Sequence, residues 1–214
     1  MTIQDILDRW RDGDEYRNHV RDLCNVTALS RYKIIGEPIS GLYGPLKDEA
    51  FVLRLALKAN KDDYQDVFVG SYAGPRLLGT EDIPPCFNPL QTVQGDGGED
   101  ASSGTSRKGH RFTPYNKELY TVINLLFIVL RMNRTRQDGP VSTCLGKLSR
   151  YGDLDLTPYW AWKMNDLMGK YKSNVADINS RLQDTHGNAR VFDFPLIRQR
   201  LEQDDRLSSH DILF

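Results

Sequence analysis

Cysteine is scarce in this sequence, and its spacing argues against two classes of protein. Cys24, Cys86 and Cys144 lie more than 50 residues apart, and none belongs to a CxxC or CxxH pair. An odd number of distant cysteines is untypical of a disulfide framework or a structural zinc site. We therefore expect three free thiols, which in most proteins are small buried side chains, and we expect no bound metal.

Histidine is equally sparse, and its four positions form no recognisable catalytic or metal-binding pattern. His19, His110, His186 and His210 are far apart, without HxH or HExxH spacing. The GxSxG turn of a serine hydrolase is also absent. We predict no catalytic residues and no cofactor. An enzyme remains an alternative, with a site assembled from residues distant in the sequence.

Long apolar runs are missing as well. The longest, residues 125–130, is far shorter than the roughly 20 residues that cross a bilayer. The first 16 residues are charged from Asp5 onward and contain no apolar core of a signal peptide. We expect a soluble protein that is cytoplasmic or otherwise intracellular, is not secreted and has no membrane partner.

The glycine-rich stretch QGDGGEDASSGTSRKGHR, residues 94–111, is the most conspicuous local feature. It lacks the GxxxxGK[ST] spacing of a phosphate-binding loop, and Asp96, Glu99 and Asp100 would repel a phosphate. Its composition is typical of a mobile connection. We predict an N-terminal helical part over 1–90, a flexible acidic-to-basic loop over 91–112 and a C-terminal helical part over 113–214, the two helical parts forming one domain.

Helical spacing of apolar residues dominates the remaining sequence and predicts a mainly α fold, a compact domain of six to seven helices with an irregular Gly/Pro-rich connection. Thr113-Pro114 and Thr157-Pro158 are typical helix starts, since Thr caps and Pro suits the first turn. The only expected strand is short, at 32–35. The predicted helices cover 2–12, 14–30, 46–60, 62–72, 115–134, 158–182 and 195–207.

Charge is distributed unevenly along the chain. Residues 107–172 carry 12 Lys/Arg and five Asp/Glu, whereas residues 1–106 carry 11 and 17. A basic segment can bind nucleic acid or another anion, or it can pack against acidic parts of the same or a neighbouring molecule. Nucleic-acid binding is therefore an alternative function. Its candidate contacts are Arg107, Lys108, Arg111, Arg131, Arg134, Arg136, Lys147 and Arg150.

Apolar residues on the predicted 158–182 helix and at the end of the sequence suggest contacts between proteins. An apolar end docks more often onto its own domain than into a partner. The lead interpretation is a non-enzymatic helical interaction or assembly protein that self-associates, as a homo-oligomer, or binds a protein partner. The candidate interface residues are Trp160, Met164, Leu167, Tyr171, Ile212, Leu213 and Phe214.

Overall fold

The fold is mixed α/β, which corrects the mainly α prediction. The structure is a computed structural model, and it describes residues 2–8, 13–80, 83–90, 112–132, 139–187, 189–203 and 212–214. Within these residues 47% are helical and 19% lie in strands. The error concerns the N-terminal third of the chain, where three segments expected to be helical form or enter an antiparallel sheet.

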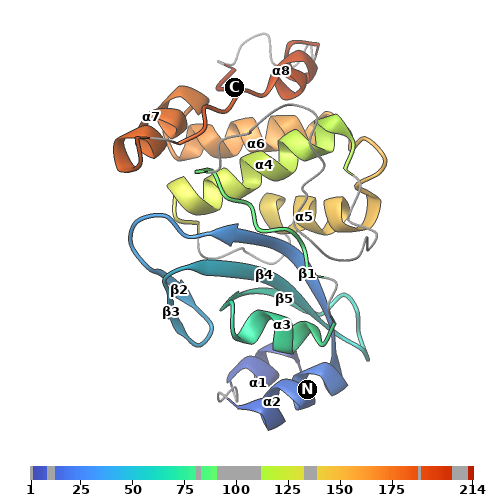
Figure 1. The fold of residues 1–214 in the computed structure, drawn as a ribbon. Helices are drawn as coiled ribbons and strands as arrows, with labels where there is room; N and C mark the ends of the chain where they lie inside the picture. The colour runs from blue at the N-terminus through green and yellow to red at the C-terminus, as the bar shows by residue number, and fades with distance from the viewer. Residues whose placement is uncertain are drawn as a thin grey trace.

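The elements stack in layers around this sheet (Figure 1). The sheet has the strand order β1-β4-β5, and β2 and β3 form a separate hairpin. One face is covered by α1, α2 and α3, and the other by α4 and α5, beyond which lie α6, α7 and α8. The elements are α1 (Ile3–Asp8), α2 (Asp14–Leu23), β1 (Cys24–Lys33), β2 (Ile39–Gly41), β3 (Gly44–Leu46), β4 (Glu49–Leu57), β5 (Tyr64–Gly70), α3 (Ala73–Leu78), α4 (Pro114–Val129), α5 (Pro140–Tyr151), α6 (Tyr159–Lys170), α7 (Val175–Thr185) and α8 (Pro195–Glu202).

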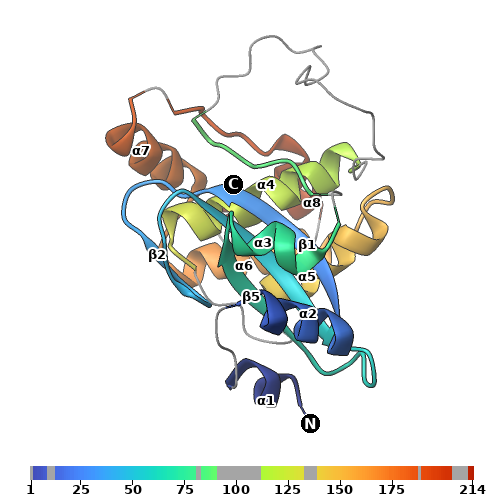
Figure 2. The same ribbon diagram turned by 60° about the horizontal axis from the view of Figure 1, so that its bottom comes forward.

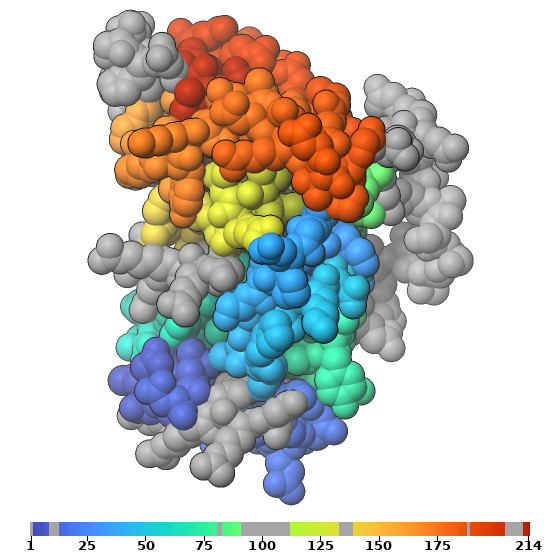
Figure 3. All heavy atoms as spheres, turned by 90° about the vertical axis from the view of Figure 1, so that its left-hand side faces the viewer, coloured from blue at the N-terminus to red at the C-terminus, as the bar shows by residue number. Residues whose placement is uncertain are grey.

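Turned views show the same order of layers. In Figure 2, α2 and α3 lie in front of the sheet, and α4 lies behind it. In the space-filling view of Figure 3, the orange and red atoms of the last helices cover the yellow end of α4, and the blue strands lie below. The sheet is therefore enclosed by helices on both faces.

This enclosure explains why 46–60 is a strand and not the predicted buried helix. Along β4, Ala50 and Val52 belong to the core shared with the C-terminal helices, while Phe51, Leu53 and Leu55 belong to the core shared with α1–α3. A strand buried on both faces carries a nearly continuous apolar run, which cannot be told from a buried helix by periodicity alone. Pairing with β1 and β5 therefore determines that this segment is a strand.

Two neighbouring helix predictions fail for the same reason. Within 62–72, Tyr64–Gly70 form β5, in which Val67 and Val69 enter one core and Phe68 the other. The predicted helix over 14–30 ends at Leu23, and the chain continues as β1. The strand expected at 32–35 corresponds to the end of β1, which begins eight residues earlier than predicted and stops at Lys33.

Several helix predictions are confirmed, although α4 ends at Val129 and not at the predicted residue 134. Thr113 caps α4, because its Oγ1 accepts a hydrogen bond from the backbone N–H of Asn116 at 3.2 Å. Helix α4 is the centre of the larger core, and Leu119, Ile123 and Leu126 are fully buried on it. Burying each such side chain stabilises the fold by about 1.5–3 kcal/mol. Helices α1 and α8 fall within the ranges predicted for them, although the predicted ends of 2–12 and 195–207 lie outside the described residues.

The helix predicted over 158–182 is two helices with a sharp turn between them. Helix α6 ends at Lys170, and Lys172 adopts a left-handed conformation with φ of 50°. The backbone N–H groups of Lys172 and Ser173 donate to the carbonyls of Gly169 and Met168, at 3.0 and 3.1 Å. This is a Schellman motif, whose left-handed position usually holds glycine. Helix α7 then starts with a capping box between Asn174 and Asp177.

Replacing Lys172 by glycine should stabilise the protein. A left-handed backbone is strained for lysine and not for glycine, so we expect Lys172→Gly to raise the free energy of unfolding by about 0.5–1 kcal/mol. Lys170→Gly, inside α6, should lower it by about as much. Urea denaturation of the three proteins measures both changes, and a loss of stability in Lys172→Gly would contradict the assignment of the turn.

A buried ion pair ties the sheet to α5. Arg54 on β4 donates from Nε and Nη2 to the two carboxylate oxygens of Asp66 on β5, at 2.8 and 3.0 Å. Its Nη2 also donates to the carbonyl and hydroxyl oxygens of Ser142 at the start of α5, at 2.8 and 2.9 Å. The Asp66 side chain is 1% exposed. Because both charges are largely desolvated, loss of either partner would leave the other buried without compensation.

The fixed position of Arg54 should make Gly146 sensitive to substitution. A Cβ atom at Gly146 would lie 2.2 Å from Nη1 of Arg54, and Arg54 cannot move without breaking its bonds to Asp66. We expect Gly146→Ala to lower the free energy of unfolding by about 1–3 kcal/mol.

A matched substitution separates this clash from helix propensity. Gly169 also lies in a helix, and its Cβ would meet only Leu213 Cδ1 at 3.6 Å, an ordinary contact. Gly169→Ala should therefore raise the free energy of unfolding, by at most about 1 kcal/mol. Thermal denaturation of both variants checks the pair, and equal effects would count against the role of Arg54.

Candidate functional site

A single buried side chain positions the connection between α5 and α6. Asn116, on the first turn of α4, is fully buried. Its Nδ2 donates to the carbonyls of Gly152 and Leu154, at 2.9 and 2.7 Å, and its Oδ1 accepts from the N–H of Leu156 at 3.0 Å. Three main-chain groups of the connection are therefore bound to α4. The side chains between them project from a backbone whose position is fixed by these hydrogen bonds.

Exposed apolar side chains occur along this connection and at the ends of the two helices that it joins. Tyr151 is 46% exposed, Leu154 65% and Tyr159 43%, and they are three of the six large hydrophobic residues that are exposed in the described part of the chain. Trp162, one turn further along α6, is half-buried, and its ring centroid lies 6.1 Å from that of Tyr159. We call Tyr151, Leu154, Tyr159 and Trp162 the aromatic surface.

Charged side chains of both signs border the aromatic surface. The Nζ atom of Lys163 lies 4.4 Å from the ring centroid of Trp162 and 5.2 Å from that of Tyr159. The guanidinium of Arg150 lies 5.9 Å from the centroid of the Tyr151 ring. Asp153 is exposed, whereas Asp155 accepts a hydrogen bond from Arg200 Nη2 at 2.6 Å. The cations hold the rings through cation–π attraction, so the aromatic surface is pre-organised.

Of the basic residues predicted to bind nucleic acid, Arg131 lies apart from Lys147 and Arg150. Arg131 follows the end of α4 and pairs with Glu37. Lys147 and Arg150 are exposed on α5, whose end is bound to the start of α4 because Thr113 N–H donates to the carbonyl of Gly152. A 16-residue helix is about 24 Å long, which separates Arg131 from Arg150. The remaining candidates, Arg107, Lys108, Arg111, Arg134 and Arg136, lie outside the described residues.

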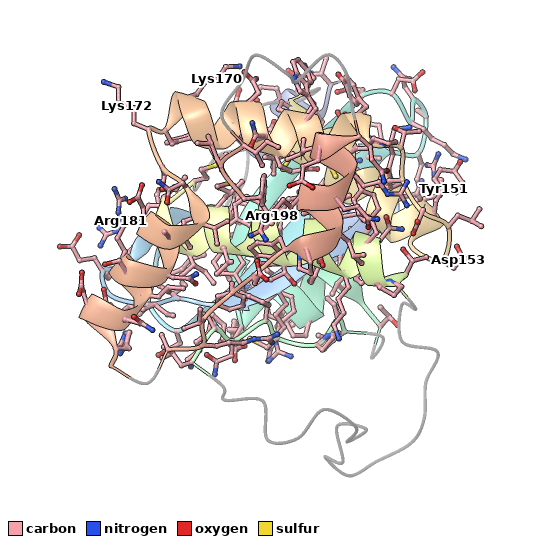
Figure 4. The ribbon with its side chains drawn as sticks, turned by 90° about the horizontal axis from the view of Figure 1, so that it is seen from above. Tyr151, Asp153, Lys170, Lys172, Arg181 and Arg198 are labelled. Carbon is pink, nitrogen blue, oxygen red and sulfur yellow. The ribbon has the colours of Figure 1, made fainter. Side chains whose placement is uncertain are left out.

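A further group of cations lies away from Arg150. Figure 4 shows Lys170, Lys172 and Arg181 on one side of the molecule and Tyr151, the residue next to Arg150, on the other. Lys170 donates to Asp166 at 2.8 Å, which neutralises part of that charge. Among the described residues, the positive charge predicted from the sequence is thus distributed over several faces.

The candidate interface residues of α6 and of the last segment differ in exposure. Trp160, Met164 and Phe214 are buried, Leu167, Ile212 and Leu213 are partly buried, and Tyr171 is 45% exposed. The buried members pack within the protein's own core, as do Ile212 and Leu213 in part. Tyr171 is therefore the member whose ring is most available at the surface.

A second cluster of polar side chains joins three distant parts of the sequence. Glu49 on β4 accepts two hydrogen bonds from Arg31 on β1, at 2.7 Å from Nη2 and 3.1 Å from Nε. The thiol of Cys86 donates to the carbonyl of Phe87 at 3.9 Å, and the charge of the Glu49 carboxylate acts on it. We call Arg31, Glu49 and Cys86 the thiol cluster. It could not be predicted, because its members are separated by 18 and 37 residues without a recurring motif.

The electrostatics of the thiol cluster disfavour a reactive thiolate. Burial, followed by the charge of Glu49, raises the pKa of the Cys86 thiol to about 11. A protonated thiol is a poor nucleophile. Cys86 is therefore a protonated thiol at neutral pH. All three cysteines are free, as expected from the sequence.

Of the four histidines, His19 and His186 lie within the described residues, and neither belongs to the aromatic surface or the thiol cluster. The ring of His19 stands 6.3 Å from that of Tyr16 on α2, and His186 ends α7. His210 lies outside the described residues, as does His110. Within the described ranges, no three His, Cys, Asp or Glu side chains are arranged to hold a metal ion. No helix in these ranges combines the length and apolar character needed to cross a membrane.

Comparison with known proteins adds no family to this description. No protein-family model matches the chain, and no curated protein and no solved structure matches it either. The aromatic surface and the thiol cluster are therefore interpreted from their own chemistry.

The thiol of Cys86 should react slowly with alkylating reagents. At pH 8 a thiol with a pKa of about 11 has about 100-fold less thiolate than one with a pKa of 9. We expect iodoacetamide to modify Cys86 about 100-fold more slowly than a free thiol, with a rate that rises as the pH approaches 11. Peptide mass spectrometry measures the modification at Cys86 separately from Cys24 and Cys144.

Removing the neighbouring charge tests the cause. Glu49→Gln removes the anion that opposes thiolate formation, so the pKa should fall and alkylation should accelerate. Glu37→Gln, at the exposed pair with Arg131, serves as the control and should leave the rate unchanged. A rate that does not respond to Glu49→Gln would assign the slow reaction to burial alone.

Proposed function

We propose that this chain is an assembly protein that self-associates through the aromatic surface. The observation that carries the proposal is the exposed group of Tyr151, Leu154 and Tyr159 on a backbone held by Asn116. Contiguous exposed apolar residues on a folded protein mark contact sites, and aromatic side chains are enriched at the centres of interfaces. Leu154, the most exposed of the three, offers only apolar contacts.

The charges around the aromatic surface favour a protein partner over a polyanion. Arg150 and Lys163 would attract phosphate groups, but the exposed Asp153 would repel them. Mixed charge suits a protein surface that also carries both signs. In a two-fold symmetric contact, Asp153 of one copy can face Arg150 of the other while the rings pack together, as an isologous interface requires. A second copy is therefore the partner that this surface fits best.

Pre-organisation supports binding by these rings. Lys163 and Trp162 restrict Tyr159, and Asn116 fixes the connection that carries Leu154. Side chains that are already ordered lose little conformational entropy on association, which leaves more of the contact energy for affinity. Buried tyrosine and tryptophan side chains often each contribute about 2 kcal/mol or more at an interface.

The test is a pair of surface substitutions at the aromatic surface. In the variant Tyr151→Ser, Tyr159→Ser, the dissociation constant of the self-complex should rise at least tenfold, because a loss of about 1.4 kcal/mol gives this factor. Sedimentation velocity over a concentration series measures it. The matched control is Tyr72→Ser, Val191→Ser, which removes two side chains of 60% and 63% exposure elsewhere on the surface.

Two outcomes would contradict the proposal. Wild-type protein that sediments as a monomer at every concentration would exclude self-association. An equal loss of self-association in the control variant would show that the aromatic surface has no special part in it. Circular dichroism of both variants verifies that the fold is retained.

A further inference from the structure

The segment Ile212–Phe214 lies across three helices, each of which holds one main-chain group. Its Leu213 N–H donates to Asn165 Oδ1 on α6, and the Leu213 carbonyl accepts from the N–H of Val175 on α7, both at 2.9 Å. Arg198 on α8 donates from Nε to the main-chain oxygen of Phe214 at 3.0 Å. Figure 4 shows Arg198 projecting from α8 toward the middle of the helical layer.

Apolar contacts complete the attachment of the segment. Phe214 is 8% exposed and meets the ring of Phe194 edge-on, with centroids 5.8 Å apart. Leu213 packs over Gly169. A Cβ atom added at Gly169 would lie 3.6 Å from Leu213 Cδ1, an ordinary contact distance. We call Asn165, Gly169, Val175, Phe194 and Arg198 the docking site.

The docking site binds main-chain groups of the segment. Val175 is the first residue of α7, so its N–H has no carbonyl partner within the helix and depends on Leu213. Asn165 is 6% exposed, and its Oδ1 would lose the Leu213 N–H if the segment left. Buried polar groups that lose a partner destabilise the fold. An empty docking site is therefore unfavourable, and a segment that supplies one N–H and one C=O relieves it.

Recognition of this kind is not specific to a covalently attached segment. The hydrogen bonds involve main-chain atoms, as in peptides that bind by main-chain pairing. The apolar contacts require an aliphatic residue followed by an aromatic one. The segment is attached to α8 through residues 204–211, and a chain of this length can span up to about 27 Å. The hydrogen bonds that hold the segment involve the side chains of Asn165 and Arg198 and the first N–H of α7, so its departure breaks no hydrogen bond within a helix.

We propose that the docking site is a peptide-binding site whose resident ligand, Ile212–Phe214, exchanges with an extended peptide of another polypeptide. The incoming peptide carries two aliphatic residues followed by phenylalanine. The resident segment acts as an internal competitor, because a short tether gives it an effective concentration in the millimolar range. Binding is therefore weak until the resident segment is displaced. This proposal is independent of the aromatic surface.

Peptide titration tests the exchange in the full chain. The probe is a fluorescein-labelled, amidated peptide Ser-His-Asp-Ile-Leu-Phe, and a scrambled peptide of the same composition is the control. The variant Leu213→Asp places a charge on the resident segment and should vacate the docking site. Fluorescence anisotropy should show at least tenfold tighter binding of the probe to Leu213→Asp than to wild type, since a site filled nine-tenths of the time lowers affinity by this factor.

Two asparagine substitutions locate the bound probe. Asn165→Ala in the Leu213→Asp background should weaken binding at least tenfold. Asn179→Ala is the matched control, because Asn179 holds both main-chain groups of Phe192 at 2.9 Å and lies outside the docking site. Equal affinity of wild type and Leu213→Asp, absence of binding to both, or equal binding of the scrambled peptide would overturn the proposal.

Hydrogen exchange of the wild-type protein decides the matter if Leu213→Asp does not fold. The Leu213 and Phe192 amides each donate to an asparagine side chain at 2.9 Å. A difference between their exchange rates therefore reports how often each of the two segments opens. We expect the Leu213 amide to exchange at least tenfold faster than that of Phe192. A Leu213 amide that exchanges as slowly as core amides of α4 would show that the segment does not leave, and the proposal would be wrong.

Discussion

Burial of β4 on both faces is the constraint on which the architecture depends. The strand separates two apolar cores, and every side chain on it must match a helix layer above or below. Arg54 is the charged exception in its middle, and it is accommodated because Asp66 on β5 and Ser142 on α5 satisfy its guanidinium. Such pairs add little net stability, but they penalise other arrangements that leave the charge unpaired. The network therefore specifies how α5 sits on the sheet.

The outer helices are positioned by a different kind of contact, in which buried or partly buried polar side chains bind main-chain groups of distant segments. Asn116 holds the α5–α6 connection, and Asn179 holds the segment at Phe192. Glu118 accepts from the N–H groups of Leu196 and Ile197, so it caps α8 from a neighbouring helix. Burial raises the pKa of the Glu118 carboxyl, and the two N–H donors offset part of this effect. These contacts orient the irregular segments where few apolar residues are available.

The helices with strong local signals could be predicted from the sequence, because their information is local. Thr113 followed by Pro114 marks the start of α4 in any context. The strands could not, because an apolar run such as 50–57 becomes a strand only through pairing with distant residues. Asn174 and Asp177 form a capping box that marks the break after α6, whereas the spacing of the apolar residues favours one continuous helix. The aromatic surface and the docking site depend on contacts between residues such as Asn116 and Leu154, or Asn165 and Leu213, which no spacing reveals.

The way in which Asn116 holds the α5–α6 connection has an evolutionary consequence. Its hydrogen bonds reach the main-chain atoms of Gly152, Leu154 and Leu156, so the conformation of the connection does not depend on the outward side chain at Leu154. Exposed positions on a backbone fixed in this way can change by mutation while the scaffold keeps its shape. Related chains could diverge in what they bind at this position without a matching change in the residues that make them fold, and a designer could use the connection as a site for grafted contacts.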